Sequence, residues 1–236
     1  MNTLTIKYCF TLQDDSKRVF NLLLDAHTLE LTDNVPEVLP SWTNLDFHQC
    51  SNCPLSIQTH PHCPLAANLV NIVKGFDGLL SYDDIHLDVF AEDRVIYQNT
   101  TAQKGISSLM GIVNAASGCP HTVFFRPMAR FHLPLASEEE TIYRASSMYM
   151  LAQYFLKNDG KTIDLELMGL AEIYNKLQVM NTAVSQRLRA ATKTDSSINA
   201  VIMLHTFSVT LPYVIEESLE EIRYLFYPYI KSSLLY

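Results

Sequence analysis

The stretch TLTIKYCFTLQDDSKRVFNLLL, residues 3–24, decides the fold class of this chain. It holds two runs of β-branched, aromatic and aliphatic residues, separated at residues 14–16 by the turn-forming triplet DDS. This pattern predicts an antiparallel β-hairpin. The stretch IHLDVFAEDRVIYQNTT, residues 85–101, alternates in a similar way about an acidic turn at residues 92–93 and predicts a second hairpin. We therefore expect a β-sheet in the N-terminal part of the chain.

Each predicted hairpin is followed by a predicted helix. The first helix covers residues 64–76, with a proline at its first turn, apolar residues at helical spacing and a glycine near its end. The second covers residues 101–117, with Gly118 in the C-cap position. Ahead of the first helix we expect a short strand at residues 43–47, which leads into a proline-containing loop at residues 48–64.

From Ser137 onward the sequence is helical in character. Ser137 followed by Glu140 is the capping-box pattern that begins a helix. Two apolar stripes follow, the first at Ile142, Ala145, Tyr149, Ala152 and Leu156, and the second at Leu167, Leu170, Tyr174, Leu177, Asn181, Val184 and Leu188. Three basic residues, Arg187, Arg189 and Lys193, are expected to interact with the negative end of the second helix dipole.

Two further helices are expected at about residues 196–211 and 214–227. The spacing of the second stripe is also compatible with a coiled-coil dimer, but the neighbouring helices favour an intramolecular bundle. The predicted fold class is α+β, with N-terminal β-hairpins and two helices around a cysteine-rich loop, followed by an all-α helical bundle. We expect an α+β, metal-binding region at residues 1–136 and a helical region at residues 137–236.

The composition is typical of an ordinary globular protein, with 48% hydrophobic and 18% charged residues in 236 positions. The net charge of −8 argues against a nucleic-acid partner, because phosphate backbones are bound by clustered lysine and arginine. The longest apolar stretch, residues 200–215, contains polar residues and is shorter than the ~20 residues of a membrane span. The first residues do not have the pattern of a secretory signal, so we expect a cytoplasmic, reducing environment and no membrane span.

Cysteine and histidine are concentrated in HQCSNCPLSIQTHPHCP, residues 48–64, which holds three of the five cysteines and three of the eight histidines. Cys50 and Cys53 form a CxxC pattern, Cys63 follows, and Cys119 lies after the second predicted helix. In a reducing compartment such cysteines favour metal binding or redox chemistry over structural disulfides. Proline follows three of these four cysteines, which restricts the backbone and stiffens the loops that would carry the ligands.

Four thiolates suit either a [4Fe-4S] cluster or a tetrahedral Zn²⁺ ion. The Cys-Pro dipeptide resembles the last ligand of bacterial-type ferredoxins, although the cysteine spacing differs from theirs. The usual structural zinc site combines two CxxC knuckles and this chain has one, so we favour an iron–sulfur cluster held by the four cysteines. Zinc held by the four cysteines, or with His62 or His121 as an alternate ligand, remains open, as does the absence of a metal.

Other chemistry finds less support in the sequence. A thioredoxin-like dithiol needs a helix that begins at the CxxC, which Pro54 opposes, and the same proline excludes the CxxCH pattern of c-type haem. Arg126 and Arg130 could clamp an anion beside the metal, but we favour ion pairs with the acidic residues 138–140. Cys9 is expected to be an inert core residue. Nucleotide-binding and hydrolase motifs are absent, so whether a reaction is catalysed is left open.

The sequence thus predicts a metal-centre protein. We favour an iron–sulfur protein that transfers electrons or senses oxidants or iron, with its helical region in contact with a protein partner. The alternative is a non-catalytic interaction or scaffold protein in which zinc fixes the N-terminal loops. The sequence does not specify a substrate, the identity of a partner or the oligomeric state.

Overall fold

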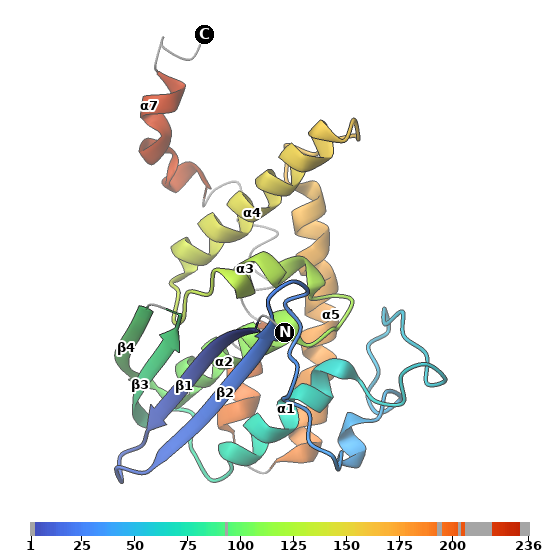
Figure 1. Cartoon of the computed structure of the whole chain (residues 1–236), viewed down its shortest axis with the longest axis vertical. Coiled ribbons are helices and arrows are strands. Elements are labelled where there is room, and N and C mark those ends of the chain that lie inside the picture. The colour runs from blue at the N-terminus through green and yellow to red at the C-terminus, as the bar shows by residue number, and fades with distance from the viewer. Residues whose placement is uncertain (1–2, 93, 193–194, 203, 206–218, 232–236) are drawn as a thin grey trace.

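The computed structural model describes residues 3–92, 94–192, 195–202, 204–205 and 219–231 (Figure 1). The predicted α+β class is confirmed, because a four-stranded antiparallel sheet in the N-terminal part of the chain combines with helices. That the C-terminal part is an all-helical bundle stays a prediction, as does the boundary between residues 1–136 and 137–236. Among the described residues, no helix is long and apolar enough to cross a membrane.

Two hairpins form the sheet, as the alternating patterns predict. They consist of β1 (Thr3–Thr11) with β2 (Lys17–Asp25), and of β3 (Asp84–Ala91) with β4 (Arg94–Thr101). The first strands of the two hairpins pair antiparallel, so the strand order is β2-β1-β3-β4. Tyr8, for example, lies opposite Phe20 on one side and Val89 on the other. Burial alternates along β1 and β3, because successive side chains point to opposite faces of the sheet. The face with the buried side chains is the one that helices cover.

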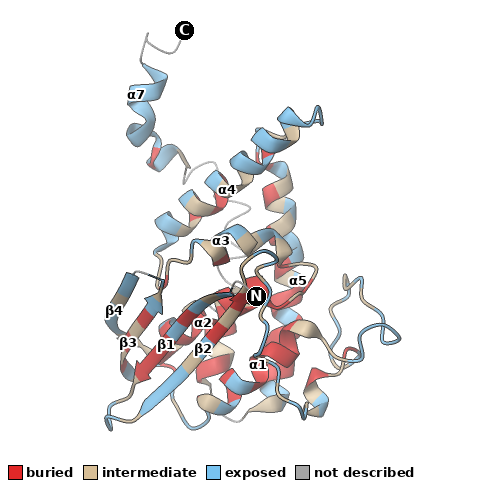
Figure 2. Cartoon of the chain, viewed as in Figure 1, coloured by how far each residue is buried: buried red, intermediate tan, exposed pale blue. Residues whose placement is uncertain are grey.

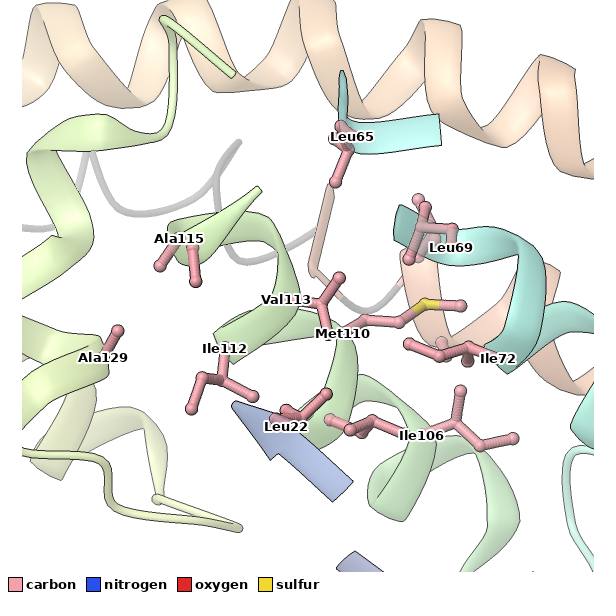
Figure 3. Packing of buried hydrophobic residues seen from close by; sticks show 14 of the residues in the cluster. Leu22, Leu65, Leu69, Ile72, Ile106, Met110, Ile112, Val113, Ala115 and Ala129 are labelled. Carbon is pink, nitrogen blue, oxygen red and sulfur yellow. The ribbon is translucent and has the colours of Figure 1, made fainter. Parts of the chain in front are cut away.

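Two helices cover that face, α1 (Pro64–Gly75) and α2 (Ala102–Ala116), and both confirm the sequence prediction. The packing is close, since a Cβ atom added at Gly105 of α2 would lie 2.8 Å from the Ile85 side chain of β3. Figure 3 shows Met110 of α2 reaching between Leu69 and Ile72 of α1. Burial of these side chains supplies much of the hydrophobic stabilisation of this layer.

The sheet and its helices consist of two ββα halves. Each half is a hairpin followed by a helix, and the two halves meet where β1 pairs with β3. The start of α1 lies against the end of α2, because Asn68 Nδ2 donates a hydrogen bond of 3.5 Å to Ser117 O. Leu31 N, from the segment before α1, donates to Ala116 O at 2.9 Å. The arrangement therefore places the residue that precedes α1, Cys63, near the segment that follows α2.

The predicted strand at residues 43–47 is wrong. The chain forms a short 3-10 helix, η1 (Ser41–Thr43), followed by turns, and the pairing there is limited to one isolated bridge between Asn44 and His62. The physical reason lies in α5, because the Arg187 side chain occupies the carbonyl groups of Trp42, Asn44 and Leu45. Those acceptors would otherwise be available to a neighbouring strand.

After the second half come the 3-10 helix η2 (Val123–Phe125) and the helices α3 (Arg126–Arg130), α4 (Glu138–Asn158) and α5 (Met168–Ala191). The capping box at the start of α4 is confirmed, since Ser137 Oγ accepts from Glu140 N and the Glu140 carboxylate accepts from Ser137 N. The apolar stripe of α5 is buried. The stripe of α4 is buried only in its first half, and Ala152 is exposed, as Figure 2 shows for the second half of the helix.

The last described residues are also helical in part. Residues 196–202 and 204–205 are helical, and η3 (Arg223–Phe226) leads into α7 (Tyr227–Ile230). The predicted helices at residues 196–211 and 214–227 lie partly outside the described residues. Buried side chains of α5 belong to the same apolar cluster as those of the sheet. This packing positions α5 against the cysteine-rich loop.

Candidate metal centre

The loop between β2 and α1, residues 26–63, carries three of the four candidate cysteines. Its two arms are joined by backbone hydrogen bonds from Leu45 N to Pro61 O at 2.9 Å and from Cys63 N to Thr43 O at 2.8 Å. The Thr43 hydroxyl is 2.8 Å from His62 Nδ1, which adds a side-chain link between the same two arms. The loop therefore has a defined conformation although it contains little regular structure.

Arg187 of α5 fastens this loop to the helical part of the chain. Its side chain is 2% exposed and donates to Trp42 O at 2.8 Å, to Asn44 O at 2.7 Å and to Leu45 O at 2.9 Å. A planar guanidinium can serve several acceptors at once, which a lysine could not do in the same geometry. The expected role of this arginine at the helix dipole is therefore wrong, because its side chain serves the loop instead.

The CxxC turn is in direct contact with the segment that follows α2. Cys53 N donates to Cys50 O at 3.0 Å, which closes the turn. His121 Nε2 lies 3.0 Å from Asn52 O, and a carbonyl can only accept, so this nitrogen carries the proton. Asn52 Nδ2 in turn donates to Lys176 O of α5 at 3.3 Å. Because His121 is two residues from Cys119, these contacts bring the distant fourth cysteine to the CxxC turn.

Two of the cysteines lie at helix ends. Cys63 is the N-cap residue of α1. Cys119 lies shortly after the end of α2 and directly follows Gly118, whose φ of +80° is in the left-handed region. Cys119 is buried, while Cys50, Cys53 and Cys63 are half-buried, and all of them are free thiols. The rigid elements on either side fix the backbone from which these two thiols project.

Cys53 and Cys63 lie close enough to Cys50 and Cys119 to raise the pKa values of those two thiols. Burial raises the pKa of Cys50 to about 11, with further increases from the neighbouring Cys63 and Cys53 and an opposing effect of the Arg187 charge. Burial also raises the pKa of Cys119 to about 12; the backbone N–H of His121 opposes this by donating to the sulfur, and the other three cysteines add to it. The fold thus gathers all four cysteines that the sequence singles out.

The thiols converge without closing around a point. Among the described residues, no three His, Cys, Asp or Glu side chains are already placed to hold one metal ion. Thiols bind metals as thiolates, so ligation would remove protons and draw the sulfurs together. The assignment of Cys50, Cys53, Cys63 and Cys119 as ligands stays a prediction.

The alternate ligands His62 and His121 lie at the edge of this group. The bond to the Thr43 hydroxyl occupies Nδ1 of His62 and leaves Nε2 for another partner. His121 uses Nε2 as a donor, which leaves Nδ1 as its acceptor, and burial lowers its pKa from the ordinary value. Either ring therefore offers one nitrogen of the kind that binds zinc.

The arginines after Cys119 have other partners than expected. Arg126 forms an ion pair with Glu30, and Arg130 with Glu92 at 3.3 Å. The predicted ion pairs of these arginines with the acidic residues 138–140 are wrong, because Glu30 and Glu92 are their partners. Cys9 lies on β1 and is 8% exposed, as expected for a core residue.

Arg187 and Asn52 are the residues of this site that the sequence reasoning missed as contributors. A signal for Arg187 was present, because it lies between Val184 and Leu188 on the apolar stripe of α5, where a charged residue is unusual. Asn52 gave no such signal. Its contacts depend on where α5 and the segment after α2 pack, which local sequence does not show.

The family comparison covers almost all of these elements. The model of the family described as "Domain of unknown function (DUF6901)" matches residues 6–227. The chain belongs to this family. Its match includes both ββα halves, the cysteine-rich loop and α5, so the candidate metal centre lies within the family domain. No curated protein and no solved structure matches the chain.

Proposed function

We propose that this chain holds an iron–sulfur cluster through Cys50, Cys53, Cys63 and Cys119, and uses it for electron transfer or for sensing oxidants or iron. The observation that carries the proposal is the convergence of four thiols from three separate segments on one place. Two of the segments are helix ends and the third is a turn closed by its own hydrogen bond. Four thiolates are the ligand set of [4Fe-4S] clusters.

The surroundings of the thiols support this chemistry. The His121 N–H that donates to the Cys119 sulfur is the type of contact that tunes cluster potentials. The half-buried Cys50 and Cys53 leave one side of the group near solvent, where an electron or an oxidant can reach it. The buried Cys119 belongs to the hydrophobic core cluster.

Anaerobic purification of the full chain tests the proposal. We expect a broad absorbance near ~400 nm that bleaches with dithionite, together with iron and inorganic sulfide in equal amounts. Replacement of any of the four cysteines by serine should reduce cluster content sharply. Cys9→Ala is the matched control, because Cys9 lies on the sheet, and it should leave the cluster in place at a cost of about 1 kcal/mol in stability. Colourless protein without iron after anaerobic reconstitution would refute the cluster.

Zinc that fixes the loops is the second candidate, and the orientation of two histidines favours it. His62 Nε2 and His121 Nδ1 are each left for another partner by the hydrogen bond at the opposite ring nitrogen. In that case the purified protein is colourless and contains one zinc per chain. Retention of zinc by Cys119→Ser, with loss in the other three serine variants, would assign the fourth ligand to a histidine.

We also propose that the helical part contacts a protein partner, and that the protein works in the cytoplasm, where reduced thiols persist. The second half of α4 supports the first point, because it presents the exposed apolar side chains Leu151, Tyr154 and Phe155. Slower amide exchange in the second half of α4 on addition of a partner would support this surface. Unchanged exchange there in a stable complex would exclude it.

A further inference from the structure

A cavity of about 680 Å³ lies between the second half of β4, α2, α3, the segment after α3, and the helices α4 and α5. This volume is in the range of ~300–1,000 Å³ that small-molecule sites occupy. The apolar part of its lining includes Ile112, Phe125, Met128, Leu133, Leu177 and Met180. Polar side chains line the cavity from several elements, and the wall formed by residues 132–144 contributes His132 and Arg144.

His132 is the first polar group of that wall, and it is joined to a chain of hydrogen bonds through Tyr8 and Ser108. Leu135 N donates to Ser108 Oγ at 3.0 Å, and Ser108 Oγ lies 3.0 Å from the fully buried Tyr8 hydroxyl. If the Ser108 hydroxyl donates a hydrogen bond to the Tyr8 oxygen, the Tyr8 hydroxyl can donate to His132 Nε2. Each of these polar groups then has a hydrogen-bond partner. His132 then carries its own proton on Nδ1, as a donor.

The protonation state of His132 agrees with this role. Burial, with the nearby Arg144 charge as the smaller cause, lowers the pKa of His132 to about 3. The ring is therefore neutral at physiological pH and presents an N–H group rather than a cation. No other hydrogen bond of His132 is formed within the described part of the chain.

Arg144 is the second donor. Its Nη2 atom donates to Met128 O at 3.1 Å and to Phe131 O at 2.9 Å, which fixes the plane of the guanidinium. Both Arg144 hydrogen bonds found among the described residues are donated by Nη2. The N–H groups of Nη1 and Nε can therefore donate to another partner. Burial lowers the Arg144 pKa, with opposing effects of Glu140 and Tyr174, but an arginine stays charged in proteins.

We propose that this cavity binds a small carboxylic acid with an apolar body, with its carboxylate at Arg144 and His132. A fixed arginine and a neutral histidine N–H form a donor-only site, which suits an anion with two acceptor oxygens. The apolar walls suit an aliphatic or aromatic body. Other charged groups that line the cavity are Lys104 and Glu138, which are both exposed and screened by solvent.

Calorimetric titration of the full chain with decanoate, and with decan-1-ol as the neutral control, tests this site. We expect decanoate to bind at least ~10-fold more tightly than the alcohol, because hydrogen bonds to a charged group are stronger than those between neutral groups. Arg144→Gln should remove most of this preference while decan-1-ol binding changes little. His132→Phe should reduce it by a smaller factor. Equal affinity for both probes, or an unchanged preference in Arg144→Gln, would overturn the carboxylate site.

A second variant is needed because Arg144→Gln also weakens the contacts to Met128 and Phe131. Gly111 lines the cavity on α2, and a Cβ atom there would meet no other atom within 4 Å. Gly111→Leu is therefore compatible with the helix and should fill part of the cavity, which abolishes binding of both probes. Full decanoate binding by this variant, or no binding of either probe to the unmodified chain, would exclude the cavity as the site. The titration does not depend on the metal centre, so the two proposals can fail separately.

Discussion

The two ββα halves differ in how the second strand reaches its helix. In the second half, Thr101 at the end of β4 is followed directly by Ala102 at the start of α2. In the first half, residues 26–63 lie between β2 and α1 and carry Cys50, Cys53 and Cys63. Both helices nevertheless pack on the same face of one sheet. The comparison shows that the ββα scaffold does not need the long connection, so the connection is where a functional explanation is required.

The long connection is held by groups outside its own half. Arg187 comes from α5, and His121 comes from the segment after α2. The direct connection of the second half needs no such support, because Ala102 N donates to Asp83 O at 2.8 Å, within the same half. If a metal is bound, it adds a further link between the loop and the end of α2. Substitutions that affect the loop at residues 26–63 without affecting the sheet and helices therefore measure what this loop contributes to stability and metal binding.

The largest expected effect is the pH dependence of metal binding at the loop. The raised pKa values of Cys50 and Cys119, about 11 and 12, keep both thiols protonated at neutral pH, so binding must release these protons. Release of these two protons alone makes the apparent affinity rise about 100-fold per pH unit, and ligation by all four thiolates gives a slope of at least this size. We expect this slope for Zn²⁺ added to the reduced, metal-free chain between pH 6 and 8, measured by competition with a chromophoric chelator.

For folding of the metal-free chain the pH dependence has the opposite sign. A raised thiol pKa stabilises the folded state below the unfolded pKa of about 8.5, and this contribution is lost as the pH rises through 11 to 12. Cys50→Ser should reduce by one the number of protons released on Zn²⁺ binding, which makes the pH dependence of the affinity about 10-fold weaker per pH unit. An affinity independent of pH would show that the four thiols are not the ligands.

Loss of Arg187 should be the next largest effect. Arg187→Met leaves the carbonyl groups of Trp42, Asn44 and Leu45 without this donor, and we expect a loss of about 3–5 kcal/mol in the free energy of unfolding. Trp42 is the only tryptophan of the chain, so its fluorescence reports on the loop while circular dichroism reports on the helices. We expect the fluorescence transition to move to a lower urea concentration than the dichroism transition.

Arg189 supplies the matched control on the same helix. It is exposed, and Arg189→Met should change the free energy of unfolding by less than about 0.5 kcal/mol. Equal effects of the two substitutions would mean that the loop does not depend on the Arg187 hydrogen bonds. Coincident transitions in Arg187→Met would mean that loop and scaffold unfold as one unit.

These contrasts also show what the sequence can and cannot predict. Both hairpins, α1, α2 and the capping box follow from local patterns, because alternation, helical spacing and turn residues act over a few positions. The strand at residues 43–47 was predicted wrongly because its carbonyl groups are bound by Arg187, which is far away in sequence. The four cysteines could be singled out by composition. Their convergence depends on the antiparallel packing of α1 and α2, which the sequence does not reveal.

Glycines near the helix ends give a smaller, backbone-based test of the two halves. Gly78 follows α1 with φ +87° and Gly118 follows α2 with φ +80°, and neither has another atom within 4 Å of an added Cβ. Alanine at either position should destabilise the fold by about 1 kcal/mol, because the left-handed conformation is strained for it. Gly111→Ala, within α2, should instead stabilise by about 0.5–1 kcal/mol. A stabilising Gly118→Ala would contradict the left-handed end before Cys119. Urea denaturation measures all three.

The smallest expected effect concerns the two surface ion pairs that join the halves to the segment after Cys119. Arg126 pairs with Glu30 of the first half, and Arg130 pairs with Glu92 of the second. All four side chains are partly exposed, so each pair should contribute less than about 1 kcal/mol and lose most of that in 1 M salt. Arg126→Gln and Arg130→Gln should therefore show similar, salt-sensitive changes in urea midpoint, without loss of metal content. A loss of metal in Arg126→Gln alone would mean that the first half needs this pair to hold its loop, since Glu30 lies in the connection that the second half lacks.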